Sequence, residues 1–98
     1  MKGIKKDNEK LPYFTVLCKQ FPLAIEALVS RSLQGHLKYI ENDADYLNWR
    51  RIDNPEKRYQ EALLRHAMYI GNEDTEIEHI AATMWNCAAL LQLKLEKK

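Results

Sequence analysis

Two histidines and an arginine lie on two neighbouring segments whose apolar residues follow helical spacing. His66 comes directly after Arg65 in the first segment, and His79 lies in the second, seven residues before Asn86. Residues seven apart lie on one face of a helix. Guanidinium and imidazole N–H groups bind phosphate oxygens through charge-assisted hydrogen bonds. These residues are therefore candidates for binding a phosphate-bearing ligand.

The same residues also have a purely structural interpretation. His66 recurs at helical spacing with apolar residues, which suits a histidine inside a core. Arg65 stands four residues after Glu61, the spacing of an ion pair on one face of a helix. Both interpretations stay open, and the presence of two histidines on helices that pack side by side favours a site.

A second group of polar and aromatic residues precedes these helices. Lys38 and Tyr39 are followed, after an acidic stretch, by Asn48, Trp49 and Arg50. Cationic side chains suit phosphates, and an aromatic ring such as Tyr39 or Trp49 can stack on a nucleotide base. The alternative for Trp49 is a loop anchor whose indole packs on the core.

Four carboxylates lie close together between the two histidines: Glu73, Asp74, Glu76 and Glu78. Clustered carboxylates are the ligands of a hard divalent ion such as Mg²⁺ or Mn²⁺. Acidic residues are also expected at the start of a helix because they complement its dipole. The sequence thus predicts either a metal site or a capped helix here.

Other catalytic signatures are missing from the sequence. It has no Gly-rich phosphate loop, no HExxH and no Ser or Cys nucleophile elbow. Neither histidine is followed by Asp, as a phosphohydrolase of the HD type would require. The acidic EExxE…ExxD arrangement of the MazG-like pyrophosphatases is absent as well.

Composition predicts one small folded domain. The chain has 98 residues, of which 46% are hydrophobic and 30% charged, with a net charge of +1. These proportions suit a globular protein, and the basic residues form no long run, so we expect no duplex nucleic acid as a partner.

The sequence predicts a cytoplasmic protein, in the host cytoplasm if a phage encodes it. Cys18 and Cys87 belong to no CxxC pair, and we expect both to be buried free thiols in a reducing compartment. The start of the chain lacks the apolar core of a signal peptide, and no apolar run is long enough to span a bilayer, so we expect no membrane partner.

Apolar spacing predicts an all-α fold, a small bundle of three main helices with a short N-terminal segment. Residues 1–10 are expected to form a flexible arm and residues 11–98 a single helical domain. The first helix is expected from Pro22 to Tyr39, with Ile25, Leu28, Val29 and Leu33 facing the core, and a loop over residues 40–53.

The last two helices are expected to form an antiparallel hairpin. Asp53 or Asn54 can cap the first of them, which has Pro55 in its first turn and Gly71 at its end. The second is expected to begin at Asp74 or Thr75, where a capping box runs to Glu78. Its broad apolar face is expected in the core and comprises Ile77, Ile80, Ala81, Met84, Trp85, Ala88 and Leu91. Faces this wide on so small a unit favour a homo-oligomer.

The order of these motifs resembles a phage-associated family, the N-terminal domain of dATP/dGTP diphosphohydrolases. Its members show a KY…NW stretch, an LLRH helix and a helix that reads like HLAHAAWNALALL. The second histidine of that last pattern is Ala82 in this chain. The resemblance covers about residues 8–93, with matches at Lys38-Tyr39, Asn48-Trp49, Leu63-Leu64-Arg65-His66 and the helix from His79 to Leu91.

The resemblance implies a helical protein that handles purine nucleotide phosphates, so residues 11–98 would be a nucleotide-binding domain. Its catalytic form would be a metal-dependent pyrophosphohydrolase that converts a purine dNTP to dNMP and pyrophosphate through attack of water on the phosphoanhydride. Carried over by position, the ligand-binding residues are Lys38, Asn48, Trp49, Arg65, His66, His79 and Asn86, to which the residue chemistry adds Tyr39 and Arg50.

Two alternatives stay open beside this interpretation. One is a protein without turnover that sequesters a nucleotide signal of host defence, which Ala82 and the missing acidic box favour. The other is a purely structural helical oligomer, against which the polar stripe of His79, Thr83 and Asn86 counts. Whether the protein is an enzyme is not decided by the sequence.

Overall fold

The computed structural model describes residues 10–39 and 48–98, except for the side chains of residues 37–39. Its elements are a π-helical turn η1 (Phe14–Cys18), helix α1 (Pro22–Tyr39), a 3-10 turn η2 (Asn48–Arg50), helix α2 (Pro55–Met68) and helix α3 (Glu76–Glu96). The predicted all-α class is confirmed, since the described residues contain no strand. Residues 1–9 of the expected arm and 40–47 of the expected loop lie outside the described part.

Prolines mark where two of the helices begin. Pro22 and Pro55 each stand at the first position of a helix, where the missing N–H needs no partner. Asn54 precedes Pro55 with a φ of 47°, and Thr75 precedes α3, but neither side chain makes a capping hydrogen bond. The predicted capping box is therefore wrong, and the helix start at Thr75 is right. Gly71 has a φ of 109°, which lets the turn between α2 and α3 close.

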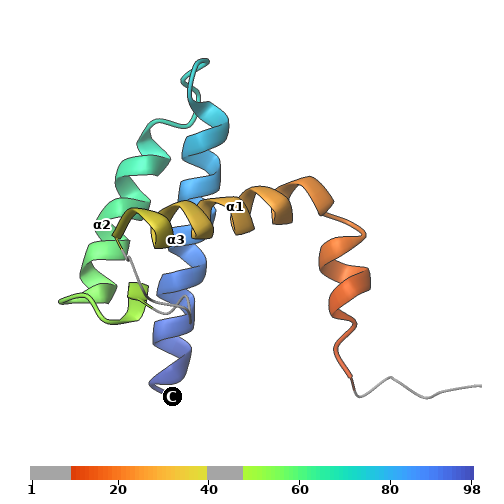
Figure 1. Cartoon of the computed structure of the whole chain (residues 1–98), viewed down its shortest axis with the longest axis horizontal. Coiled ribbons are helices and arrows are strands. Elements are labelled where there is room, and N and C mark those ends of the chain that lie inside the picture. The colour runs from red at the N-terminus through yellow and green to blue at the C-terminus, as the bar shows by residue number, and fades with distance from the viewer. Residues whose placement is uncertain (1–9, 40–47) are drawn as a thin grey trace, which may run out of the picture.

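Helices α2 and α3 lie side by side as the predicted hairpin, and α1 crosses α3 (Figure 1). The turn between α2 and α3 lies at one end of the hairpin, and the C-terminus lies at the other. η1 packs against the start of α1, at the end of α1 that points away from the hairpin. In the described part of the chain, the interior lies along α3, which packs against both α1 and α2.

Small side chains of α3 form the buried centre of this region. Ala82 is completely buried, and Asn86 and Ala89 are each 5% exposed. Their spacing of four and three residues places them on one face, and their size lets the backbones of neighbouring helices approach closely. The prediction that the apolar face of α3 forms the core is wrong in part, because Ile77 is 79% and Leu91 59% exposed.

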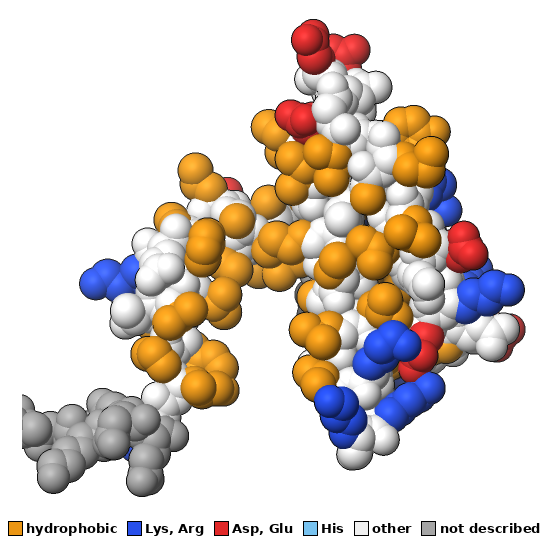
Figure 2. Space-filling model, turned by 180° about the vertical axis from the view of Figure 1, so that it is seen from behind, with side chains coloured by type: hydrophobic (Ala, Val, Ile, Leu, Met, Phe, Trp, Pro, Cys, Tyr) orange, Lys and Arg blue, Asp and Glu red, His pale blue; other side chains and the backbone are white. Residues whose placement is uncertain are grey.

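Large apolar side chains are exposed elsewhere as well. Figure 2 shows them spread over η1, α1 and the hairpin, and they include Phe14, Leu23 and Val29. Cys18 and Cys87 are free thiols, as predicted, but the expectation that they are buried is wrong, because both are exposed. Among the described residues, no helix combines the length and the apolar character needed to cross a bilayer.

Candidate functional site: a basic pocket between three helices

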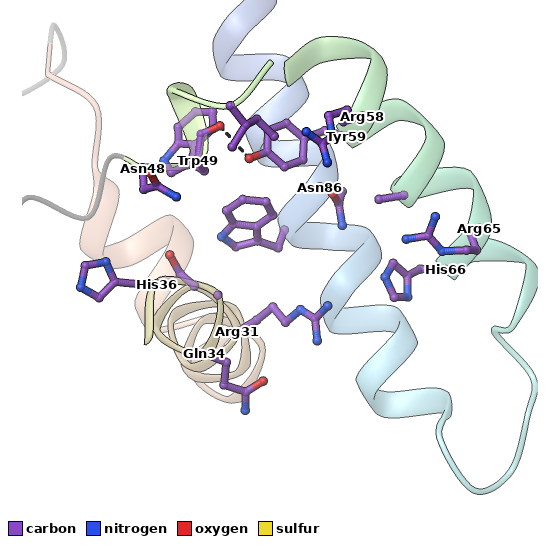
Figure 3. A pocket seen from close by; sticks show the side chains of 15 residues that line it. Arg31, Gln34, His36, Asn48, Trp49, Arg58, Tyr59, Arg65, His66 and Asn86 are labelled. Carbon is purple, nitrogen blue, oxygen red and sulfur yellow. Dashed lines mark hydrogen bonds between the residues drawn. The ribbon is translucent and has the colours of Figure 1, made fainter. Parts of the chain in front are cut away.

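A cavity of about 630 Å³ lies where α1, η2 and the α2–α3 hairpin meet (Figure 3). This volume is in the range of pockets that hold small-molecule ligands. Its lining residues come from all these elements and are Arg31, Ser32, Gln34, Gly35, His36, Asn48, Trp49, Ile52, Arg58, Tyr59, Ala62, Arg65, His66, Trp85 and Asn86. None of these described lining residues is a carboxylate.

Arginines give the pocket a positive charge. Arg31 reaches toward the hairpin from α1, while Arg58 and Arg65 belong to α2, seven residues apart on one face. None of them forms an ion pair with a described residue, so the predicted alternative pairing of Arg65 with Glu61 is not formed. A smaller hollow of about 500 Å³ brings Asp53 and Glu61 to the other side of Arg58 and Arg65.

The two histidines meet across the hairpin. Nδ1 of His66 lies 3.0 Å from Nδ1 of His79, and the ring of Tyr69 stacks on His79 with 5.2 Å between centroids. Burial lowers the pKa of His66, and the charges of Arg31 and Arg65 lower it further. His66 is therefore a neutral hydrogen-bonding group at neutral pH, and the positive charge of the pocket comes from its arginines.

Asn86 is the buried polar residue of the pocket. Its Nδ2 donates a hydrogen bond to the main-chain oxygen of Ala82, with 2.7 Å between the atoms. The amide oxygen has no hydrogen-bond partner among the described residues, which leaves it available to a donor group of a ligand.

Three aromatic rings form one side of the pocket. Trp49, Tyr59 and Trp85 pack edge-to-face, with centroids 5.4 to 6.1 Å apart. The hydroxyl of Tyr59 donates to the main-chain oxygen of Trp49 at 2.6 Å, which ties η2 to α2. Trp49 therefore anchors η2 and lines the pocket as well, so its two predicted roles are not exclusive.

The predicted ligand-binding residues fall into three groups. Asn48, Trp49, Arg65, His66 and Asn86 line the pocket together. His79 lies behind His66 and is not among the lining residues. Arg50 turns toward the end of α3, where its two Nη atoms donate to the Glu96 carboxylate at 3.0 and 2.6 Å and its Cζ lies 4.9 Å from the Trp49 ring centre. The side chains of Lys38 and Tyr39 lie outside the described part of the structure.

The acidic residues predicted to hold a metal do not fit one in this structure. Glu73, Asp74, Glu76 and Glu78 occupy the turn and first residues of α3, and none of them lines the pocket. Within residues 10–39 and 48–98, no three His, Cys, Asp or Glu side chains converge as metal ligands would. Asp74 instead bonds within the turn, where its N–H donates to Oδ1 of Asn72 at 3.1 Å.

Sequence reasoning missed several lining residues, among them Arg31, His36, Arg58, Tyr59 and Trp85. A signal for Arg58 was present, because it stands seven residues before the predicted site residue Arg65, on the same face of a predicted helix. No comparable spacing in the sequence pointed to Arg31. Its role depends on the crossing of α1 over α3, which joins residues far apart in the chain.

Comparison with known proteins supports the resemblance seen in the sequence. A family model described as dATP/dGTP diphosphohydrolase, N-terminal, matches residues 1–98. Searches of curated proteins and of solved structures gave no match.

Proposed function

We propose, because the chain belongs to the family of dATP/dGTP diphosphohydrolase N-terminal domains, that its basic pocket binds a purine nucleotide or a nucleotide-derived phosphate. One observation carries the proposal: among the residues that the structure describes, three arginines and two histidines line the cavity, and no carboxylate does. A pocket of this charge attracts an anion, and guanidinium groups without an ion-pair partner gain most from one.

The phosphates would lie between α1 and α2. Arg31 and Arg65 approach this part of the pocket from different helices, and His66 lies beside Arg65 (Figure 3). Guanidinium groups on two sides can hold one phosphate in a bidentate manner or bridge two successive phosphates. Binding would also join α1 to the hairpin through the ligand.

The nucleoside would lie toward η2 and α3. Trp49 and Trp85 offer aromatic surface there, and Asn48 and Asn86 offer amide groups for hydrogen bonds to a base. Stacking on an aromatic ring depends little on which base the nucleotide carries, whereas hydrogen bonds from amide groups distinguish one base edge from another. The purine preference in the family's description is consistent with a large apolar wall.

Two forms of this function differ in whether the ligand is cleaved. Hydrolysis of a phosphoanhydride by a Mg²⁺-dependent mechanism needs carboxylates beside the phosphates. None of the described lining residues is a carboxylate, and this lining is the argument for binding without turnover, including the sequestering of a nucleotide signal. The family's description favours hydrolysis of dATP or dGTP, so hydrolysis is the second candidate.

A binding and turnover experiment tests the proposal. The protein is titrated with dATP, dGTP, the ribonucleotides, cyclic nucleotides and inorganic pyrophosphate, each with Mg²⁺ and with EDTA. Heat of binding and released pyrophosphate are both measured. We expect saturable binding of at least one purine nucleotide, with the ligand recovered unchanged. Release of pyrophosphate would establish the hydrolytic form, and absence of binding to every ligand would disprove the proposed function.

A matched pair of variants controls for nonspecific attraction of anions. Arg65→Ala removes a charge in the pocket, whereas Arg50→Ala removes the same charge outside it, where Arg50 is paired with Glu96. Binding in the pocket predicts a large loss of affinity for Arg65→Ala only. Equal losses would mean that net charge alone attracts the ligand.

A further inference from the structure

The contact between His66 and His79 constrains where the ring protons lie. Their Nδ1 atoms are 3.0 Å apart. A contact of this length is a hydrogen bond, in which one Nδ1 carries a proton and the other presents a lone pair. If both Nδ1 atoms carried a proton, two N–H groups would face each other, and if neither did, two lone pairs would. The neutral pair therefore has two states, which differ in the ring that donates.

The state of the pair decides what His66 offers to the pocket. A neutral imidazole has a single N–H. When His79 donates, the proton of His66 lies on Nε2, and His66 offers a donor. When His66 donates from Nδ1, its Nε2 offers a lone pair instead. His66 lines the pocket, and its Nε2 has no hydrogen-bond partner among the described residues.

An anion in the pocket would select one of these states. The charged and titratable groups around His66 are Arg31 from α1, Arg65 from α2 and His79 from α3. The ring of Tyr69 stacks on the ring of His79. A phosphate oxygen held by the two arginines beside His66 would be repelled by a lone pair on Nε2. It would accept a hydrogen bond from an Nε2–H. The bound anion therefore favours the state in which His79 is the donor.

We propose that His79 is a positioning residue that acts through His66: by donating its Nδ1 proton to Nδ1 of His66, it makes His66 an Nε2–H donor for a phosphate oxygen. This inference rests on the proposed function, because it requires an anion in the pocket. His79 does not touch the ligand, which agrees with its absence from the pocket lining. His79 acts on the ligand by determining which ring nitrogen of His66 carries the proton.

Nuclear magnetic resonance of protein labelled with ¹⁵N in its histidines tests this directly. The ¹⁵N chemical shifts distinguish protonated from unprotonated ring nitrogens. In wild-type protein saturated with inorganic pyrophosphate, we expect protons on Nε2 of His66 and on Nδ1 of His79. An unprotonated Nε2 of His66 in that complex would overturn the inference.

Three variants separate positioning from packing. His79→Asn keeps a donor near the position of Nδ1, His79→Leu removes it, and Tyr69→Leu removes the stacked ring but keeps the histidine pair. We expect His79→Leu to bind pyrophosphate about tenfold more weakly, as loss of one oriented hydrogen bond predicts. His79→Asn and Tyr69→Leu should stay within about twofold to threefold of wild type. Circular dichroism identifies any variant that loses its helices. If His79→Leu is unfolded, the ¹⁵N spectra of the wild-type complex test the inference instead.

A pH profile gives a readout that a purely structural role would not change. Protonated His66 would attract the anion, so affinity should rise on the acid side. His79→Leu removes the ring whose interaction with His66 lowers the pKa of His66, so that pKa should rise. The increase in affinity should therefore begin at a higher pH in His79→Leu than in wild type. Identical profiles would contradict the positioning role.

The two proposals fail in different ways. If wild-type protein binds neither pyrophosphate nor any nucleotide, the proposed function is wrong and this inference is wrong with it. If wild-type protein binds pyrophosphate, but His79→Leu binds it with the same affinity and the same pH profile, the inference alone is wrong.

Discussion

Arg31 and Arg65 contribute the charge that defines the pocket, and they reach it from different helices. Neither forms an ion pair with a described carboxylate. An unpaired guanidinium beside another one is unfavourable for the empty protein, because like charges repel. Such an arrangement is expected where a ligand supplies the opposite charge.

Arg65→Ala should weaken nucleotide binding by about tenfold to a hundredfold, the usual effect of losing a charge-assisted hydrogen bond. Arg31→Ala should have an effect of similar size. The double variant should lose less than the product of the two factors, because both groups contact the same phosphates. Isothermal titration measures all three affinities, and strictly multiplicative losses would mean that the two arginines contact separate parts of the ligand.

Glu56 and Glu96 each form ion pairs with basic side chains, and these pairs should make the stability of the protein depend on pH. Hydrogen bonding from Lys97 lowers the pKa of Glu56 below its ordinary value of 4.5, and hydrogen bonds from Gln92 and then Arg50 lower that of Glu96. A lowered pKa in the folded state contributes stability above the unfolded-state value, and this contribution is lost as the pH falls through the folded-state value.

We therefore expect the melting temperature of the wild type to fall as the pH is lowered from 7 to about 3, most steeply below about pH 4.5. Glu56→Gln and Glu96→Gln should each lower the melting temperature slightly at pH 7 and flatten the acid-side decrease. Scanning calorimetry over this range measures both effects. An acid-side decrease that is equally steep in both variants would assign it to other carboxylates.

At the scale of the elements, α3 is the helix on which the others pack. It packs against both α1 and α2, and its buried residues are Ala82, Asn86 and Ala89. The absence of large side chains there brings the helices close together, and it leaves room for the pocket beside Asn86 and Trp85. The position at which the family pattern has its second histidine is Ala82, the most buried of these residues.

Ala82→Leu should destabilise the protein by about 1–3 kcal/mol, because a larger side chain at a closed helix contact forces the helices apart. Ala88→Leu provides the matched control, since the same change on the exposed side of α3 should cost less than about 0.5 kcal/mol. Chemical denaturation measures both free energies of unfolding. Equal effects would show that the packing face of α3 is assigned wrongly.

In the molecule as a whole, the described helices bury little of their apolar surface. Leu23 is 79%, Phe14 67% and Val29 62% exposed, and Ile77 on α3 is 79% exposed. Monomeric proteins rarely leave so many large apolar side chains in water. We infer that these surfaces lie against further copies of the chain. The exposed faces of α1 and α3 are free to pack against another copy, because η1 and the start of α1 do not cover the hairpin of their own chain.

The expected result is an oligomer, measured as a mass well above the 11.6 kDa of one chain by light scattering or sedimentation. Phe14→Glu with Leu23→Glu should reduce the mass toward that of a monomer, because charged side chains are costly in an apolar interface. The helix content should change little. A single-chain mass at every concentration would disprove self-association, and the apolar surface would then need another partner.

The helices and their hairpin could be predicted from the amino-acid sequence alone. Prolines at Pro22 and Pro55 and the turn at Gly71 act through local geometry, so their effect can be read along the chain. The spacing of residues also predicted that His66 and His79 lie on neighbouring helices. The residue types and motifs predicted further ligand-binding candidates, namely Arg65, Asn86, Asn48 and Trp49. The family pattern pointed to the same residues, because its motifs lie on these local elements.

Which helix faces pack against one another follows from the tertiary structure and could not be predicted from spacing. The apolar stripe of α3 was expected inside, yet Ala82, Asn86 and Ala89 are buried and Ile77 is not. Local spacing shows which residues share a face, but the choice of face depends on how closely helices can approach. The crossing of α1 over α3 brings Arg31 into the same pocket as Arg65 and His66, residues too far from it in the chain for spacing to reveal the arrangement.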